Sequence, residues 1–214
     1  MRTLIRKGFR VAVGEQLETP AEAKKRGGKS VVKRDVVRLV TPGTLTEDSL
    51  LEARRHNFLV SYSELRDEAA LAWADISTGA FHVMPISRLR LSPELARLAP
   101  SELIVAEGAP YEAAAALADE YKIPLTPLGK ASFDSTAAEK RICNLFVVGA
   151  LDGFGTFSRA EVSAMGALID YLEITQKGKL PLLQPPVQES EDRVVQIDAS
   201  TRASLELTRS LSCA

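Results

Sequence analysis

The chain has 214 residues, of which 45% are hydrophobic and 26% charged, as in an ordinary soluble protein that can bury a sizeable core. No apolar run approaches the roughly 20 residues that span a bilayer, and Cys143 and Cys213 form no C-x-x-C pair, which excludes a membrane protein, a disulfide scaffold and a zinc knuckle. The net charge of −1 hides an asymmetry: residues 1–40 carry 11 Lys or Arg against 4 Asp or Glu, and this end therefore favours a polyanionic partner.

The N-terminal part predicts two strands and little else. Residues 9–13 predict a short strand, and residues 31–41 predict a longer one that is rich in β-branched residues. A Lys- and Gly-rich segment, 18–30, connects them. After the turn at Pro42-Gly43, a short helix is expected to begin at Thr44 or Thr46.

The middle of the chain predicts a mixed sheet. Three strands follow one another closely, at 57–63, 71–77 and 80–86. Gly79 is placed for a tight turn, so these strands should form an antiparallel meander. Beyond them, helices that open at Ser92-Pro93 and Pro110 alternate with strands at 102–107 and 123–128, which predicts a parallel region.

Two helices with capping signals end this part of the chain. Thr136 with Glu139, and Ser158 with Glu161, each have the spacing of a capping box. Residues 179–192 contain three prolines and predict an exposed linker, and a strand at 194–198 and a helix at 199–211 follow. The order of elements from 57 to 175 predicts a ribonuclease H-like α/β domain with a mixed sheet, flanked by partial domains.

A nucleotide site at Gly28-Lys29-Ser30 is not supported. A phosphate-binding loop needs a glycine five residues before Gly28, where Ala23 stands, and a helix after the loop, where Val31 and Val32 favour a strand. The triplet is better explained as part of a basic loop.

A metal-dependent nuclease is the alternative enzymatic hypothesis, because ribonuclease H-like folds often hold two metal ions with clustered carboxylates. Asp75 lies on the second strand of the meander, and Glu107 ends the strand at 102–107. The first strand supplies no carboxylate, so the candidate metal site is weak and Asp75 is better explained as a hydrogen-bonded residue near a turn.

The basic cluster near the N-terminus is the remaining functional signal. Its seven members lie within 15 residues: Lys24, Lys25, Arg26, Lys29, Lys33, Arg34 and Arg38. Strand alternation predicts that Arg34 and Arg38 share one face and that Lys33 points to the other. Such a surface suits a phosphate backbone and does not read bases, although a merely solvated face has the same composition.

Several long stretches resemble one family. GFRVAVGEQLETPAEAKKR and VVKRDVVRLVTPGTLTEDSLL are similar to the junction between the mismatch-binding and connector domains of bacterial MutS DNA mismatch repair proteins. LAWADISTGAF resembles the connector strands of this family, and IDASTRASLELTRSLS resembles the entry to its core (lever) region.

The resemblance implies four segments: the end of a mismatch-binding domain at 1–44, a connector domain at 45–178, a linker at 179–192 and the start of a core domain at 193–214. In the family, the whole protein is a homodimer in the bacterial cytoplasm, associated with the nucleoid. It binds mismatched double-stranded DNA, binds and hydrolyses ATP with Mg²⁺, and recruits MutL.

The departures from the family are also informative. The mismatch-reading Phe-x-Glu motif does not occur, no phosphate loop is present, and position 14 is Gly where the family is expected to have Cys. The resemblance therefore implies a fragment or truncated product that is non-catalytic and holds no cofactor or metal. Its candidate contacts to the DNA backbone are Lys29, Lys33, Arg34 and Arg38.

Overall fold

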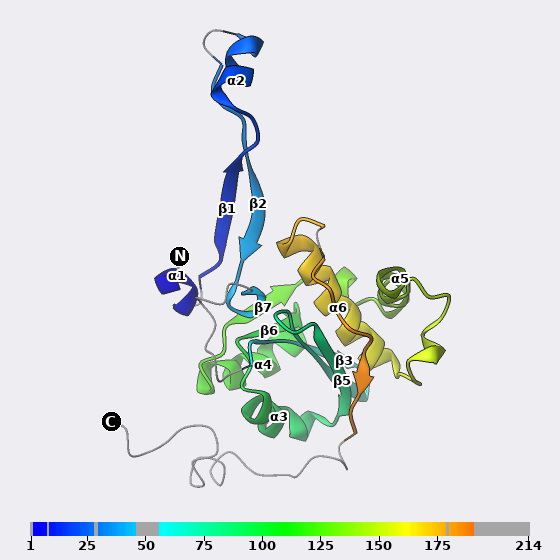
Figure 1. The fold of residues 1–214 in the computed structure, drawn as a ribbon. Helices are drawn as coiled ribbons and strands as arrows, with labels where there is room; N and C mark the ends of the chain where they lie inside the picture. Colours follow the sequence, from blue (N-terminus) through cyan, green and yellow to red (C-terminus); the bar gives the residue numbers. More distant parts are fainter. Residues whose placement is uncertain (1, 8, 28–29, 46–55, 179, 191–214) are drawn as a thin grey trace.

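A computed structural model describes residues 2–7, 9–27, 30–45, 56–178 and 180–190 of the chain. It contains a six-stranded sheet covered by helices, from which a two-stranded ribbon extends (Figure 1). None of the helices within these ranges is long and apolar enough to cross a membrane.

The main sheet is mixed, as predicted. Its strands are β3 (Phe58–Leu65), β4 (Glu68–Asp75), β5 (Ala80–Ile86), β6 (Glu102–Ala106), β7 (Leu125–Leu128) and β8 (Val187–Gln188). The spatial order is β7-β6-β3-β4-β5-β8. The antiparallel meander β3-β4-β5 is confirmed, with Gly79 at φ 77° in its second turn, and β6 and β7 extend the sheet in parallel to β3.

Helices cover both faces of this sheet (Figure 1). They are α3 (Leu91–Leu98), α4 (Ala109–Glu120), α5 (Ser135–Phe146) and α6 (Arg159–Thr175), together with four short 3₁₀ turns, η1 (Pro42–Thr44), η2 (Arg88–Arg90), η3 (Lys130–Phe133) and η4 (Leu151–Gly153). Alternation along β3 divides the core, because Leu59 packs with α6 and Val60 packs with α3 and α4.

Local capping signals locate one helix start and misplace another. The capping box of Ser158 and Glu161 is confirmed: the Glu161 N–H donates to Ser158 Oγ at 3.2 Å, and the Ser158 N–H donates to Glu161 Oε2 at 2.7 Å. The predicted box of Thr136 and Glu139 is wrong. Asp134 accepts from the Ala137 N–H at 2.7 Å, so α5 begins two residues earlier than the box would require.

The two long helices cross at very close range. Gly166 of α6 lies against Ala138 of α5, and a methyl group at Gly166 would be 2.1 Å from the Ala138 Cβ. The absence of a side chain is therefore what lets α6 lie against both α5 and the sheet.

The N-terminal part contains more than the predicted pair of strands. The elements are α1 (Arg2–Arg6), β1 (Val11–Gln16), α2 (Pro20–Arg26) and β2 (Arg34–Val40). The remainder of the helix predicted from Thr44 or Thr46, the Gly28-Lys29 part of the triplet, and the elements predicted after 193 lie outside the described residues.

The segment predicted as an exposed linker is attached to the sheet. Although most of residues 181–190 are exposed, β8 pairs with β5 in parallel, the Gln184 N–H donates to the Gly79 carbonyl at 2.8 Å, and Leu183 is buried. The prolines prevent a longer strand, but they do not prevent these contacts at the edge of the sheet.

Candidate nucleic-acid interface

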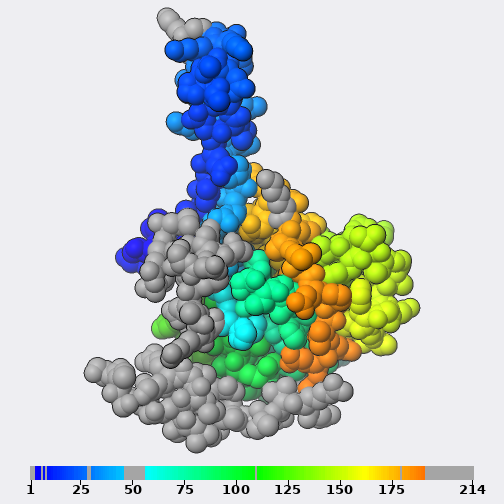
Figure 2. Space-filling view, viewed as in Figure 1, coloured from blue at the N-terminus to red at the C-terminus, as the bar shows by residue number. Residues whose placement is uncertain are grey.

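The ribbon of β1 and β2, with α2 at its far end, forms an arm whose far part is exposed, while Val40 at the end of β2 is buried at the body. Figure 2 shows this arm projecting from the rest of the molecule, and Figure 1 places α2 at its tip. An antiparallel ribbon without neighbouring strands exposes both of its faces, so basic side chains on the arm can reach a large polyanion without interference from the body.

The tip of the arm is built on a local signal that was visible in the sequence. Thr19 caps α2, Pro20 occupies the first turn, and Glu22 completes a capping box in which its carboxylate accepts from the Thr19 N–H at 2.7 Å. The T-x-x-E spacing with a following proline could have predicted this helix. The last turn of α2 consists of Lys24, Lys25 and Arg26, which places three cations at the tip.

One acidic residue neutralises part of this basic cluster. Glu18 forms an ion pair with Arg26 and accepts a hydrogen bond from the Lys33 N–H at 2.6 Å. That backbone hydrogen bond, together with the Arg26 guanidinium, holds the pKa of Glu18 below its usual value. Through Glu18, Arg26 thus connects α2 to the segment that leads into β2. The ammonium groups of Lys24 and Lys25 form no ion pair with any of the described residues.

The predicted contact residues are distributed differently from what strand alternation suggested. Val13 pairs with Arg38 but Gly14 pairs with Val36, so β2 contains one extra residue at this point. Because this bulge reverses the alternation, Arg34 and Arg38 lie on opposite faces of the ribbon, and the prediction that they share a face is wrong.

The same register brings Lys33 to the face of Arg38. The Lys33 carbonyl accepts from the Leu17 N–H at 2.9 Å, and Leu17 is four residues from Val13, the partner of Arg38. Lys29 lies outside the described residues. The arm therefore presents cations on both of its faces, and no flat basic surface is formed.

At the base of the arm, a buried carboxylate collects four hydrogen bonds. Glu102 at the start of β6 is 1% exposed. Its Oε2 accepts from Thr41 Oγ1 at 2.6 Å and from the Gly43 N–H at 3.0 Å, and both of these donors belong to the segment that leaves β2.

The other oxygen of this carboxylate faces the body of the domain. Glu102 Oε1 accepts from Thr126 Oγ1 of β7 and from the Tyr171 hydroxyl of α6, each at 2.6 Å. Burial and the neighbouring carboxylate raise the pKa of Tyr171, so its hydroxyl keeps the proton that it donates. No sequence signal marked Glu102, because its partners lie 24 to 69 residues away.

The carboxylates of the nuclease hypothesis lie at opposite ends of the sheet. Asp75 is paired with Phe58 at the start of β3, whereas the strand leading to Glu107 runs past Tyr62 toward the other end. The register separates the two by six residues, or about 20 Å along the strands. Metal ions in two-metal sites are ~4 Å apart, so this pair cannot hold them.

Asp75 has the structural role expected of a residue near a turn. It accepts from Ser77 Oγ at 2.6 Å and from the Ser77 N–H at 3.0 Å, and His56 Nδ1 lies 3.3 Å away. Burial acts to raise the pKa of Asp75, but these hydrogen bonds outweigh it and hold the pKa below its usual value. Among the described residues, no group of three metal-ligating side chains is found.

A second polar cluster holds the chain where it leaves the sheet. Glu189, directly after β8, lies 3.1 Å from His82 Nδ1 and 3.6 Å from Arg97 Nη2. The neighbouring His82 imidazole, 3.1 Å away, holds the pKa of Glu189 below its usual value. The guanidinium of Arg97 also lies over the Trp73 ring, 5.3 Å from its centroid. The entering and leaving segments are thus both fixed to the domain by buried or half-buried carboxylates.

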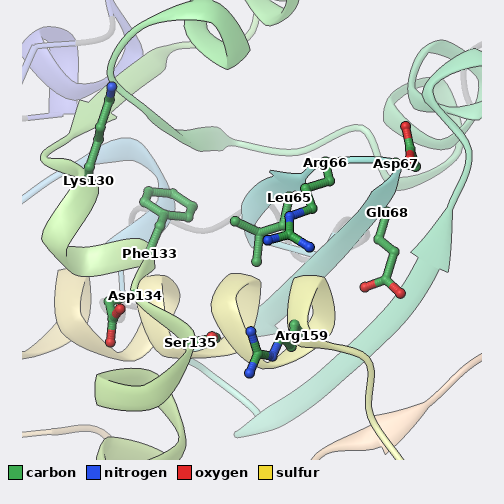
Figure 3. A pocket seen from close by; sticks show the side chains of 9 residues that line it. All are labelled: Leu65, Arg66, Asp67, Glu68, Lys130, Phe133, Asp134, Ser135 and Arg159. Carbon is green, nitrogen blue, oxygen red and sulfur yellow. The ribbon is translucent and has the colours of Figure 1, made fainter.

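One cavity lies away from the arm. It has a volume of about 630 Å³ and is lined by residues at the Leu65 end of β3 (Figure 3). Phe58 and the Glu102 cluster lie at the other end of this strand. Three basic and three acidic side chains line it: Arg66, Lys130, Arg159, Asp67, Glu68 and Asp134. Because the charges balance, the cavity does not extend the basic surface of the arm.

Two family models match successive parts of the chain. A family model described as MutS domain I matches residues 1–49, and one described as MutS domain II matches residues 57–184. Proteins described as DNA mismatch repair protein MutS, from Ruegeria sp. (strain TM1040) and Ruegeria pomeroyi, are 87% and 79% identical over 98% of this chain. The chain spans 24% of the length of each of these curated relatives.

Among solved structures, T. thermophilus RuvC in complex with Holliday junction substrate aligns with 55% of this chain and 98% of its own. The identity is 10% and the TM-score is 0.38, a value that supports no conclusion about the fold.

Proposed function

Since the chain belongs to the MutS family of DNA mismatch repair proteins, and its matched regions are the mismatch-binding and connector parts, we propose that it carries a DNA-contacting arm on a non-catalytic connector domain. In the complete protein, these parts would serve mismatch binding that is coupled to ATP binding and hydrolysis with Mg²⁺. MutL and a second copy of the protein would be partners, and the bacterial nucleoid in the cytoplasm would be the setting.

The observation that carries the proposal is the exposed, unpaired charge on the projecting arm. Within the described residues, the side chains of Lys24, Lys25, Lys33 and Arg34 form no ion pair, although Glu15, Glu18, Glu22 and Asp35 lie on the same arm. Cations on both faces suit the curved surface of a duplex, where phosphates are contacted from more than one direction.

The order of strands supports a ribonuclease H-like fold for the connector. Three antiparallel strands come first, and the strands of the following strand–helix units join in parallel beside the first of the three. This arrangement places the exit of the arm, at Thr41 and Gly43, beside the start of β6.

Duplex binding by the purified chain tests the proposal. Fluorescence anisotropy should show salt-dependent binding that does not distinguish a G·T mismatch from a homoduplex, because backbone contacts carry no sequence information. The double variant Lys33→Gln/Arg34→Gln should bind more weakly and should lower the slope of log K against log salt by about 2, since each lost phosphate contact is worth ~0.9.

Lys140→Gln is the matched control, because Lys140 is exposed on α5, away from the arm. An unchanged salt slope in the double variant would show that the arm does not contact the backbone. Mismatch discrimination by this chain would contradict contacts to the backbone alone, and ATP hydrolysis would contradict its assignment as a non-catalytic connector.

A further inference from the structure

We propose that Glu102 is a positioning residue that fixes the direction of the arm relative to the connector sheet. The consequence for DNA binding rests on the function proposed above, but the positioning itself is a property of this chain. The two oxygens of the carboxylate divide between the two parts of the molecule. Among the residues that the structure describes, Oε2 accepts from the exit of the arm, at Thr41 and Gly43, and Oε1 accepts from the body, at Thr126 and Tyr171.

Both strands of the arm reach this cluster. Thr41 follows β2 directly, and Arg10, which precedes β1, donates from Nη2 to Thr126 Oγ1 at 3.5 Å. A ribbon held at only one strand could turn about that point. Contacts at the roots of both strands oppose such a rotation, because turning the ribbon would stretch one set of hydrogen bonds.

The backbone at Gly43 lies directly on the Glu102 side chain. A Cβ at Gly43 would be 2.9 Å from the Glu102 Cβ and 2.6 Å from Leu59 Cδ1. Such a close approach leaves no room for water between the exit of the arm and the carboxylate. The hydrogen bonds at the joint are therefore made directly between protein groups, which gives the arm one preferred direction.

The site needs a carboxylate specifically. All four partners of Glu102 are donors, and an ionised carboxylate accepts at both of its oxygens. A glutamine has the same shape, but its amide nitrogen would face two donors on one side of the joint. No basic side chain of the described residues forms an ion pair with Glu102, so these hydrogen bonds are what hold its buried side chain in place.

The test measures the direction of the arm in the 214-residue chain without DNA. Spin labels at Gln16→Cys on the arm and Lys140→Cys on α5, in a Cys143→Ser/Cys213→Ser background, report the distance by double electron–electron resonance. We expect a narrow distribution for the parent protein. Glu102→Gln should broaden or shift it, and Thr41→Val, which removes one arm-side donor, should do so to a smaller extent.

Glu94→Gln is the matched control. Glu94 is an equally buried glutamate, 2% exposed, but its partners Arg90 and Arg97 both belong to the body. It should lower the melting temperature and leave the distance distribution narrow. The proposal is overturned if Glu102→Gln and Thr41→Val keep the parental distribution below their melting temperatures, or if Glu94→Gln broadens it equally. If Glu102→Gln does not fold, Thr41→Val decides alone.

These outcomes are separate from those of the DNA experiment. A chain that binds no duplex would refute the proposed function and leave the distance result unaffected. A chain that binds duplex with an arm of unchanged direction in both joint variants would refute the role of Glu102 alone.

Discussion

Replacing Gly166 with alanine should destabilise the connector by about 2 kcal/mol. The added methyl group would lie 2.1 Å from the Ala138 Cβ and 2.7 Å from its Cα, and both of these atoms are held on α5. Overpacking of this kind costs ~1–3 kcal/mol, and the rigid neighbours favour the upper end. Alanine recovers about 1 kcal/mol through its better helix propensity, which leaves the stated loss.

Thermal and urea unfolding measure this loss directly. For a chain of this size, 1 kcal/mol corresponds to about 2–4 °C, so the melting temperature of Gly166→Ala should fall by roughly 4–8 °C. Adding Ala138→Gly should restore part of the stability, because it removes the Cβ, the nearer of the two Ala138 atoms that the new methyl group meets. Gly149→Ala is the control, since a methyl group at Gly149 would meet no atom within 4 Å, and its effect should stay within ~0.5 kcal/mol.

A stable Gly166→Ala protein would refute the reasoning about this helix crossing. So would a double variant whose losses simply add, because two residues in direct contact must show coupling if the contact is the cause of the loss.

Two further predictions concern pH and helix capping. The pKa of Asp75 is lower in the folded chain, so its contribution to stability is present above the unfolded pKa of about 3.9 and is lost as the pH falls through the folded pKa. In urea unfolding, the free energy of unfolding should be higher for the parent chain than for Asp75→Asn at pH 7, and this difference should narrow by about pH 3. A difference that stays constant with pH would contradict the lowered pKa of Asp75. Ser158→Ala should lower the free energy of unfolding by about 1 kcal/mol because it removes the cap of α6. Thr136→Ala should change it by no more than ~0.5 kcal/mol, and equal losses in the two variants would contradict the observed start of α5.

Where the determinants are local, the sequence predicts the fold well. The strand at 80–86 and the capping box of Ser158 and Glu161 follow from side chains a few residues apart, and both are confirmed. The capping box of Thr19 and Glu22 is equally local, and α2 could have been predicted from it. The start of α5 was misplaced because Asp134 and Thr136 are both acceptable caps, and sequence alone does not decide between them.

Non-local determinants explain what the sequence could not predict about the candidate site. The bulge at Val37 depends on how β2 is paired with β1, and it moves Arg38 to the face opposite Arg34. The Glu102 cluster draws on β2, β6, β7 and α6, so no periodicity or spacing reports it. Asp75 and Glu107 were considered together because ribonuclease H-like folds often cluster carboxylates on their strands. The register of the strands, which sequence alone does not give, separates the two residues.

The length of the arm turns a small angular error into a large positional one. At about 3.4 Å per residue, the seven residues of β2 extend about 24 Å. The distance range of a good hydrogen bond is about 0.5 Å wide, and across two strand roots about 4.8 Å apart this range allows a rotation of roughly 6°. Such a rotation moves the far end of β2 by about 2.5 Å. Long, freely rotating lysine and arginine side chains can absorb an error of this size. A rigid group at the same tip could not compensate for a displacement of this size. The accuracy with which the arm is held is therefore sufficient for flexible cations, which need no exact position.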